Sequence, residues 1–307
     1  MPSDHVSRHH PVLGTVLELR VAGPDDEAGA RRVEDVVLAE FDRLEALFSV
    51  YRVDSALVRW RTAAIDGPGP EVTDVLALAE HWWRVGDGAF HPATAAMTAC
   101  WRRAATTGVP PSDDELDALA GGAATLPYTV VDGRLRRTGD ATGVDLNALA
   151  KGWIVDRAVR AGRAVDGVTR LVVNAGGDLV HRGDGEVVVA IEDPSRPHQN
   201  AAPIDRLAIS NEALATSGSA HRGVRVAGRW YGHVIDPRTA RPVDHVRSAS
   251  VVAPDAATAD AVATIVGVWP VDRSLELVDT LDGVSCCLVD ADGRVHTDPT
   301  WAVRRVR

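Results

Sequence analysis

Two kinds of apolar periodicity alternate along this chain, and their order is the feature that most constrains its fold. Residues 14–23 alternate apolar and polar side chains as a strand does, whereas residues 26–48 repeat apolar side chains at helical spacing. Turn signals such as Asp132-Gly133 then join neighbouring strands into hairpins. Hairpins and helices without a regular strand–helix–strand repeat predict an α+β fold, in which mixed, largely antiparallel sheets pack against helices.

The same patterns locate the other elements. Ser112 and Glu115 form a capping box before a short helix. His5, His9 and His10 are placed in an N-terminal tail and look incidental to the chemistry, and the stretch ATSGS reads as a loop that follows a strand. Further helices are predicted in 71–88, after the turn at Pro92, at about 146–161 with Gly162 as its end, in the second half of 248–269 and near 273–281.

Length and composition place the chain among soluble globular proteins. Its 307 residues, without an internal repeat or an obvious linker, predict a single domain over 1–307; two intimately packed subdomains are the alternative. The formal net charge of −10 argues against a nucleic-acid binder or an anionic-membrane binder. An anionic ligand would therefore need a local cation or a metal ion.

Location and redox state can also be predicted. No apolar run reaches the ~18 residues of a membrane span, and the N-terminus lacks a signal-peptide pattern, so we expect no membrane span and a cytoplasmic protein. Cys100, Cys286 and Cys287 fit neither a disulfide framework nor a zinc site. The adjacent pair lies in a predicted strand, where the two thiols should face opposite sides and be buried.

Lys151 is the only lysine, because all the other basic residues are arginines. Lysine is a compact charge on a flexible stem, whereas arginine is planar and forked. A site that keeps lysine in an arginine-rich chain is a candidate functional site that needs this compact charge. The alternative is a surviving lysine on a solvated helix face.

Asp260 and Thr264 lie four residues apart on a predicted helix and therefore share one face. A carboxylate and a hydroxyl presented together suit a hard cation that takes oxygen ligands. The alternative is that Asp260 caps a helix that begins near Thr258, while Thr264 packs inward.

His233 lies in a predicted strand, three residues before an Asp-Pro turn. A neutral histidine can take a proton from a hydroxyl, although a hydrogen-bonded structural histidine fits the position equally well. Asp236 would either orient His233 or cap the turn at Pro237. Two glycine-containing stretches, NAGGD (174–178) and ATSGS (215–219), would bring backbone N–H groups close to an anion or would simply form tight turns.

Five stretches in this order, DLNALAKGWIVD, NAGGD, ATSGS, HVIDPRT and ADAVAT, resemble the ApbE-type flavin transferases, the FAD:protein FMN transferases. The resemblance covers most of the chain and implies an ApbE-like, T-fold-related architecture. It implies that Mg²⁺, with Mn²⁺ as the alternative, is bound by Ala148 through its carbonyl oxygen, by Asp260 and Thr264, and by the backbone oxygen of Ala263. It also implies that Lys151 lies beside the pyrophosphate of FAD and that His233 is the catalytic base.

The resemblance implies FAD contacts less uniformly. Leu13 replaces the usual methionine of a Met-Gly-Thr motif, and His91 replaces the aspartate of a Gly-x-Phe-Asp-Pro loop. The FAD-contacting positions that it implies are Leu13, Tyr51, Ala89, Phe90, His91, Asp145, Lys151 and Val234.

The implied reaction transfers the FMN half of FAD to a threonine hydroxyl of an acceptor protein and releases AMP. The implied partners are thus FAD and that acceptor, with no nucleic acid. Two alternatives use the same residues: a metal-dependent FAD pyrophosphatase that releases FMN and AMP, and a non-catalytic flavin-binding protein.

Overall fold

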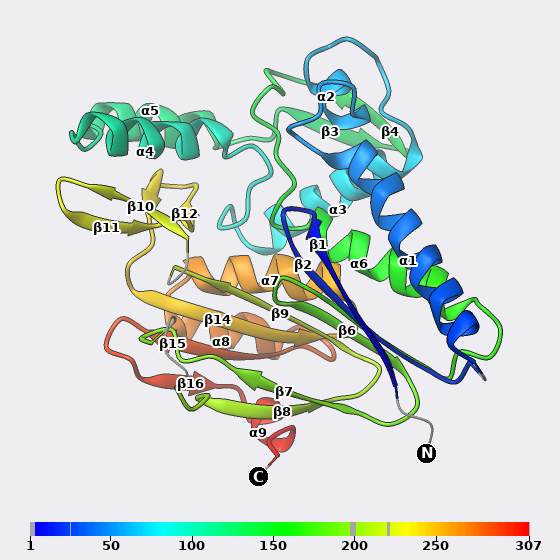
Figure 1. The fold of residues 1–307 in the computed structure, drawn as a ribbon. Helices are drawn as coiled ribbons and strands as arrows, with labels where there is room; N and C mark the ends of the chain where they lie inside the picture. Colours follow the sequence, from blue (N-terminus) through cyan, green and yellow to red (C-terminus); the bar gives the residue numbers. More distant parts are fainter. Residues whose placement is uncertain (1–3, 25, 197–200, 220–221, 307) are drawn as a thin grey trace.

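An antiparallel sheet of eight strands forms the centre of the molecule (Figure 1). The computed structural model describes residues 4–24, 26–196, 201–219 and 222–306. From one edge to the other, the strands are β1 (His5–Val12), β2 (Thr15–Ala22), β5 (Arg170–Ala175), β6 (Asp178–Gly183), β9 (Ala213–Gly218), β14 (Val246–Ala253), β15 (Ser285–Asp290) and β16 (Val295–Thr297).

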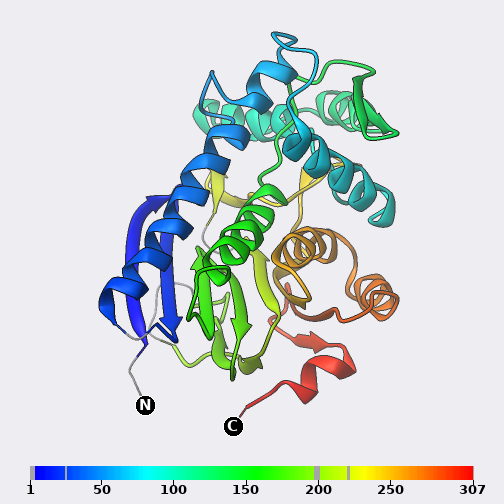
Figure 2. The same ribbon diagram turned by 90° about the vertical axis from the view of Figure 1, so that its right-hand side faces the viewer.

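Helices cover one face of this sheet and a hairpin covers the other (Figures 1 and 2). The helical layer contains α1 (Glu27–Phe48), α6 (Ala150–Arg163), α7 (Ala256–Val268) and α8 (Val271–Asp279), and it shares the main apolar core with the sheet. On the opposite face, the hairpin of β7 (Val187–Ile191) and β8 (Asp205–Ile209) packs with α9 (Pro299–Val303) over a second core.

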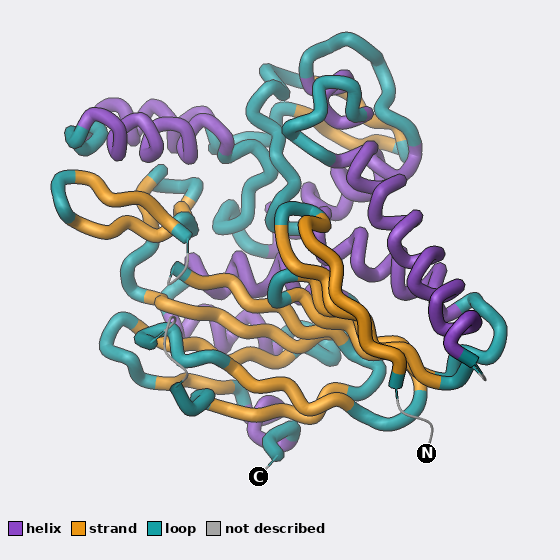
Figure 3. Tube along the Cα trace, viewed as in Figure 1, coloured by secondary structure: helices purple, strands orange, loops and turns teal. Residues whose placement is uncertain are grey.

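Smaller units extend beyond the sheet, as the separate strand pairs in Figure 3 show. Helices α4 (Ala95–Thr107) and α5 (Asp113–Gly122) enclose a third core with the hairpin of β10 (Gly223–Val226) and β11 (Arg229–Gly232) and the strands β12 (Ile235–Asp236) and β13 (Arg241–Pro242). The remaining elements are α2 (Ala56–Arg61), α3 (Pro70–Val85), β3 (Tyr128–Val131) and β4 (Arg134–Arg137).

The predicted α+β class with largely antiparallel sheets is confirmed. The side-chain oxygens of Asp26 and Ser112 cap α1 and α5, and Asp132 and Gly133 adopt the positive φ angles of a tight hairpin turn. Cys286 and Cys287 are both buried and belong to the cores on opposite sides of the sheet, as the strand pattern predicts.

Four predictions about elements are wrong. The N-terminal histidines belong to the edge strand β1, where His5 and His9 bind Glu34. Helix α6 begins at Ala150, because residues 146–149 form a turn. The ATSGS stretch is largely strand β9. Gly162 lies inside α6, and a Cβ there would come within 2.7 Å of Val37 on α1 and Leu171 on β5. It therefore allows close packing and does not end the helix.

Among the described residues, no helix combines the length and the apolar character that crossing a membrane requires.

Candidate functional site

The first turn of α6 lies against the start of α7, and this contact organises the candidate site. Gly152 allows the approach, because a Cβ at this position would collide with the carbonyl oxygen of Ala256. Asp156 strengthens it by accepting hydrogen bonds from the backbone N–H groups of Ala256 and Ala257, both at 3.0 Å. The contact leaves the N-terminal end of α6 next to side chains of α7.

Lys151 projects from this turn and forms an ion pair with Asp178, the first residue of β6, at 2.5 Å from Nζ to Oδ2. Burial by itself would lower the pKa of Lys151, but the carboxyl groups of Asp178 and Asp260 more than offset it, and the net pKa is raised. Burial raises the pKa of Asp178 despite the opposing effect of Lys151. Lys151 is therefore a charged ammonium group, and the solvated-surface alternative is wrong.

Asp260 is the second buried carboxyl group of the cluster, with 8% of its surface exposed. Burial and the neighbouring Asp178 raise its pKa to about 7, whereas Lys151 and the N–H of Gly152 act in the opposite direction. Its Oδ2 is buried and has no hydrogen-bond partner among the described residues. A buried oxygen without a partner is costly unless a ligand satisfies it.

The predicted face of α7 is present, and the capping alternative for Asp260 is wrong. Asp255 caps this helix by accepting from the N–H of Thr258 at 2.8 Å, so Asp260 is free to point elsewhere. Thr264 lies one turn further on, and its hydroxyl donates to the carbonyl oxygen of Asp260 at 3.1 Å. The helix thus presents a carboxyl and a hydroxyl group on the face predicted from the sequence.

The oxygen donors here suit a hard cation. The carbonyl oxygen of Ala148 receives no capping or loop hydrogen bond from the backbone of the described residues. Ala263 lies inside α7, where helical geometry directs its carbonyl oxygen to residue 267. No cluster of three His, Cys, Asp or Glu side chains suited to a metal occurs within the described ranges. A cation would therefore depend on Asp260, Thr264 and Ala148, together with water or ligand oxygens.

His233 lies between β11 and β12, not inside a strand as predicted. Its backbone N–H donates to the carbonyl oxygen of Arg222 at 3.1 Å. The residue is exposed as a whole, yet the protein around the ring lowers its pKa, first by desolvation and then through the charges of Arg222 and Lys151. A neutral imidazole that solvent can reach is able to accept a proton.

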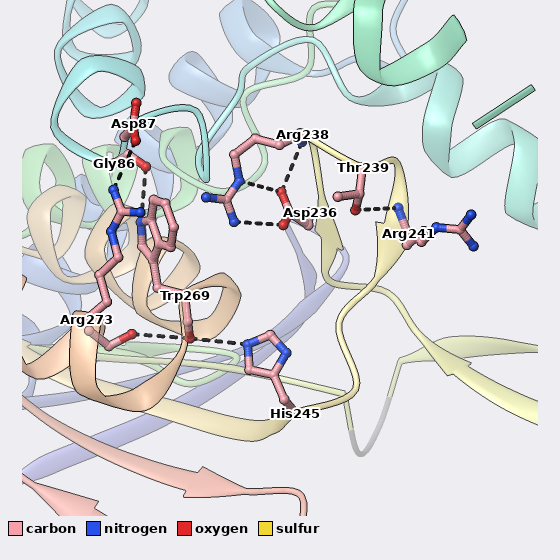
Figure 4. Close-up of polar contacts among 10 residues, drawn as sticks. Gly86, Asp87, Asp236, Arg238, Thr239, Arg241, His245, Trp269 and Arg273 are labelled. Atoms are coloured by element: carbon pink, nitrogen blue, oxygen red, sulfur yellow. Dashed lines mark hydrogen bonds and ion pairs between the residues drawn. The ribbon is translucent and has the colours of Figure 1, made fainter. Parts of the chain in front are cut away.

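Asp236 does not orient His233. Its two carboxylate oxygens bind Arg238, at 2.8 Å to Nε and 2.7 Å to Nη2 (Figure 4). The guanidinium group of Arg238 lies 3.7 Å from the ring centre of Trp269, the residue that ends α7. Arg273 also stacks on Trp269, and its guanidinium group donates to the carboxyl group of Asp87 at 2.9 Å. The turn after His233 is thus fastened to the end of α7.

Two loops that the sequence assigned to FAD lie together. The N–H of Asp145 donates to the carbonyl oxygen of Pro92 at 2.6 Å, which places the loop around His91 beside the loop before α6. Burial raises the pKa of Asp145 and lowers that of His91. Ala89 and Phe90 have buried side chains in the main core. The structure therefore gives these two side chains a packing role.

The other predicted FAD positions are placed as follows. Leu13 lies in the turn between β1 and β2 with φ +49°, and the backbone N–H of Gly176 binds Val16 just after that turn. Tyr51 is 82% exposed in the loop after α1. Val234 is partly buried, and its carbonyl oxygen accepts from the N–H of Val243.

The family of this chain follows from its similarity to known proteins. The sequence profile described as the ApbE family matches residues 13–288. The chain belongs to the ApbE family. It is 28% identical to an Escherichia coli K12 protein named FAD:protein FMN transferase, over 94% of this chain and 84% of that one. A Rhodobacter capsulatus protein of the same name is 32% identical, over 88% of this chain and 53% of its own length.

Solved structures confirm the ApbE fold. The Thermotoga maritima ApbE protein superposes with a TM-score of 0.83 at 24% identity, and the match covers 99% of this chain and all of that one. A histidine-to-glycine mutant of the Vibrio cholerae flavin transferase ApbE gives 0.82 at 22% identity, over 98% and 99% of the two chains.

Two charged residues of this ApbE family member were not assigned a role from the sequence. Asp178 closes the NAGGD stretch, where an acidic residue directly after a glycine turn was a usable signal. Arg222 shifts the pKa values of His233, Lys151 and Asp178, so it lies within electrostatic range of all three. No sequence pattern marked Arg222, because it reaches the site through the backbone hydrogen bond that its carbonyl oxygen accepts from His233.

Proposed function

We propose that this chain is a Mg²⁺-dependent FAD:protein FMN transferase that cleaves the pyrophosphate of FAD, joins FMN to a threonine hydroxyl of an acceptor protein and releases AMP. The names of its relatives support the flavin transfer. The observation that carries the proposal is the buried group of Lys151, Asp178 and Asp260 at the contact of α6 and α7. A chain with a net charge of −10 needs such a fixed cation to hold a dinucleotide.

Lys151 would serve as the fixed counter-charge for the pyrophosphate. Its ammonium group is already paired with Asp178 and lies within electrostatic range of Asp260, so it is oriented before the substrate arrives. Preorganised charge of this kind stabilises developing negative charge without a cost of reorganisation at the moment of reaction.

Asp260, Thr264 and the Ala148 carbonyl oxygen would hold the metal ion. The unpartnered Oδ2 of Asp260 is the observation that supports this set. When bound, Mg²⁺ supplies charge neutralisation to the phosphate oxygens. The free carboxyl group has a pKa of about 7, so a nearby divalent cation would also favour its ionised form.

His233 would act as the base. The threonine oxygen of the acceptor forms a bond to the phosphorus of the FMN half, while the bond from that phosphorus to the oxygen of the AMP half breaks. The threonine proton passes to an imidazole nitrogen of His233, and the departing AMP phosphate retains the electron pair. A depressed pKa keeps the imidazole neutral and ready to accept the proton at pH 7.

The loops around the site would hold the rest of FAD. We place Asp145, His91 and the backbone of Val234 in this role, with Leu13 and Tyr51 at its border. Arg61 supports that arrangement, because its guanidinium group donates to Val144 and Val50 and so links the segments before Asp145 and Tyr51.

The test combines FAD and Mg²⁺ with a candidate acceptor protein and with the same acceptor carrying Thr→Val at the target. We expect in-gel flavin fluorescence only on the threonine form, together with AMP release. Asp260→Ala should reduce Mg²⁺-dependent turnover by about a hundredfold or more. Asp255→Ala is the matched control on the same helix and should cost only about 1 kcal/mol of stability. His233→Ala should slow transfer more than it weakens FAD binding.

Three outcomes would contradict the proposal. AMP and FMN without labelled acceptor would indicate a pyrophosphatase. Stoichiometric FAD binding without turnover would indicate a flavin carrier. Equal activity of Asp260→Ala and the unmodified chain would remove the metal assignment.

A further inference from the structure

The hairpin of β10 and β11 carries a local charge opposite to that of the whole chain. Residues 222–233 contain three arginines and no acidic residue, whereas the chain as a whole has a net charge of −10. Arg222, Arg225, Arg229 and Trp230 are all exposed, the last with 41% of its surface. We call these four residues the hairpin surface; the strand register places Arg225 and Trp230 on one face of the hairpin and Arg229 on the other, next to Tyr231.

These arginines are weakly engaged by the part of the protein that the structure describes. There, Arg225 donates only to the carbonyl oxygen of Gly228, at 3.3 Å. The guanidinium group of Arg229 lies 5.1 Å from the ring centre of Tyr231 and approaches Asp244 at 3.4 Å. Both side chains of the ion pair are largely exposed, and such a pair exchanges easily with solvent or a partner. Arg222 has no side-chain ion pair with any residue in the described ranges. Their charge is therefore available to a partner.

The hairpin surface leads directly to His233. Arg225 and Trp230 are cross-strand partners, with the guanidinium group 5.8 Å from the indole ring. The indole lies over Gly223, where a Cβ would come within 2.6 Å of the ring. Arg222 directly precedes Gly223, and its carbonyl oxygen accepts a hydrogen bond from the backbone N–H of His233. A chain segment lying on this surface would therefore reach the candidate base.

The face of the hairpin that carries Val226 and Tyr231 is fixed to the protein. Val226 is buried in the core shared with α4 and α5, and Tyr231 stacks on Trp101 with ring centres 4.7 Å apart. A rigid backing of this kind suits recognition, because little conformational freedom is lost when a partner binds. Exposed tryptophan and arginine are also the residue types that contribute most to protein interfaces.

We propose that the hairpin surface docks the acceptor protein through an acidic segment that flanks its target hydroxyl. Charge complementarity between that segment and the three arginines would guide its approach and set its direction toward His233. This inference rests on the proposed function, because it assigns the acceptor side of the same reaction.

The experiment measures binding separately from catalysis. The probes are two short fluorescein-labelled peptides with a central threonine, one flanked by Asp and Glu and the other by Asn and Gln. Fluorescence anisotropy at low salt compares the unmodified chain, Arg225→Glu/Arg229→Glu, and the control Arg134→Glu/Arg136→Glu. The control reverses the same number of exposed charges on the β3–β4 hairpin, which lies apart from β10–β11 in Figure 1.

The unmodified chain and the control should bind the acidic peptide about tenfold more tightly than the neutral one, and Arg225→Glu/Arg229→Glu should lose this preference. Arg225→Glu alone, which leaves the Arg229–Asp244 pair intact, should lose part of it. The Kd for FAD should stay within about twofold in every variant, because neither arginine belongs to the proposed FAD site.

Equal binding of the two peptides, or an equal loss in the control, would overturn the inference. Tighter binding of a single-stranded oligonucleotide through the same arginines would also overturn it, in favour of a nucleic-acid surface. A charge-dependent peptide preference in a chain that releases no AMP would refute the proposed function and leave the docking surface standing.

Discussion

The two sides of the candidate site are built differently. On one side, α6, α7 and β6 hold Lys151, Asp178 and Asp260 in a close-packed contact where the carboxyl groups are almost fully buried. On the other side, His233 and the hairpin surface reach solvent on a small two-stranded unit. This difference indicates that charged groups for a small anionic substrate must be held in place by the packed core. A surface for a large partner needs only a rigid element behind it.

Removing the buried ammonium group of Lys151 should cause the largest loss of activity. Lys151→Met leaves two neighbouring buried carboxyl groups without their counter-charge, and we expect the kcat/KM for FAD to fall by about a hundredfold to a thousandfold. Lys151→Arg should give an intermediate loss, because the forked group fits poorly in a 2.5 Å ion pair. Steady-state AMP release measures both variants.

Arg157→Met is the matched control for Lys151. This arginine lies on the same helix, stacks on Trp153 and approaches Glu71 at 3.6 Å, outside the site. Its removal should change turnover by no more than about twofold. Full activity of Lys151→Met would show that the buried charge serves stability alone.

The close contact of α6 and α7 predicts the next largest effect. Gly152→Ala places a methyl group against the Ala256 carbonyl oxygen, so the helices must separate, and we expect the free energy of unfolding to fall by about 2–3 kcal/mol. Denaturant titration followed by circular dichroism gives this value. Gly121→Ala on α5, where a Cβ meets no atom within 4 Å, should be neutral or stabilising by under about 1 kcal/mol. A matching loss in both variants would refute the packing argument.

The smallest expected effect concerns the exposed side. The pKa of His233 is depressed by desolvation and by Arg222, so the neutral base persists below pH 7 and activity should fall only as the pH drops through that lowered value. Arg222→Ala removes a cation, raises the pKa of His233 and should move the acid limb of the pH–rate profile to higher pH. Arg225→Ala, on the same hairpin, should leave the limb unchanged. If the acid limb of the pH–rate profile does not move in Arg222→Ala, the ionisation that it reports does not belong to His233.

The sequence predicted the elements whose signals are local. The apolar face of α1 is buried throughout, because helical spacing alone decides which of its side chains point inward. Strand β1 escaped prediction since its polar side chains, which bind Glu34, hide the alternation of an edge strand. The start of α6 was placed too early because local hydrogen bonds form a turn there, from the N–H of Leu149 to the carbonyl oxygen of Leu146 and from the N–H of Asn147 to the carboxyl group of Asp145.

The candidate site residues also divide into those with a local sequence signal and those that depend on the fold. The shared face of Asp260 and Thr264 was predictable from their spacing on one helix. The pairing of Lys151 with Asp178 was not, because it depends on where β6 lies in the sheet relative to α6. Arg222 likewise reaches His233 only through the hairpin geometry.

The burial of all three cysteines offers a practical consequence for labelling. Cys100, Cys286 and Cys287 are inaccessible free thiols, and burial raises the pKa of the latter two to about 12, which suppresses the reactive thiolate. Maleimide dyes should therefore leave the native chain largely untouched. An Arg225→Cys substitution would then provide a single attachment point for a fluorophore, from which the arrival of a partner could be followed in real time.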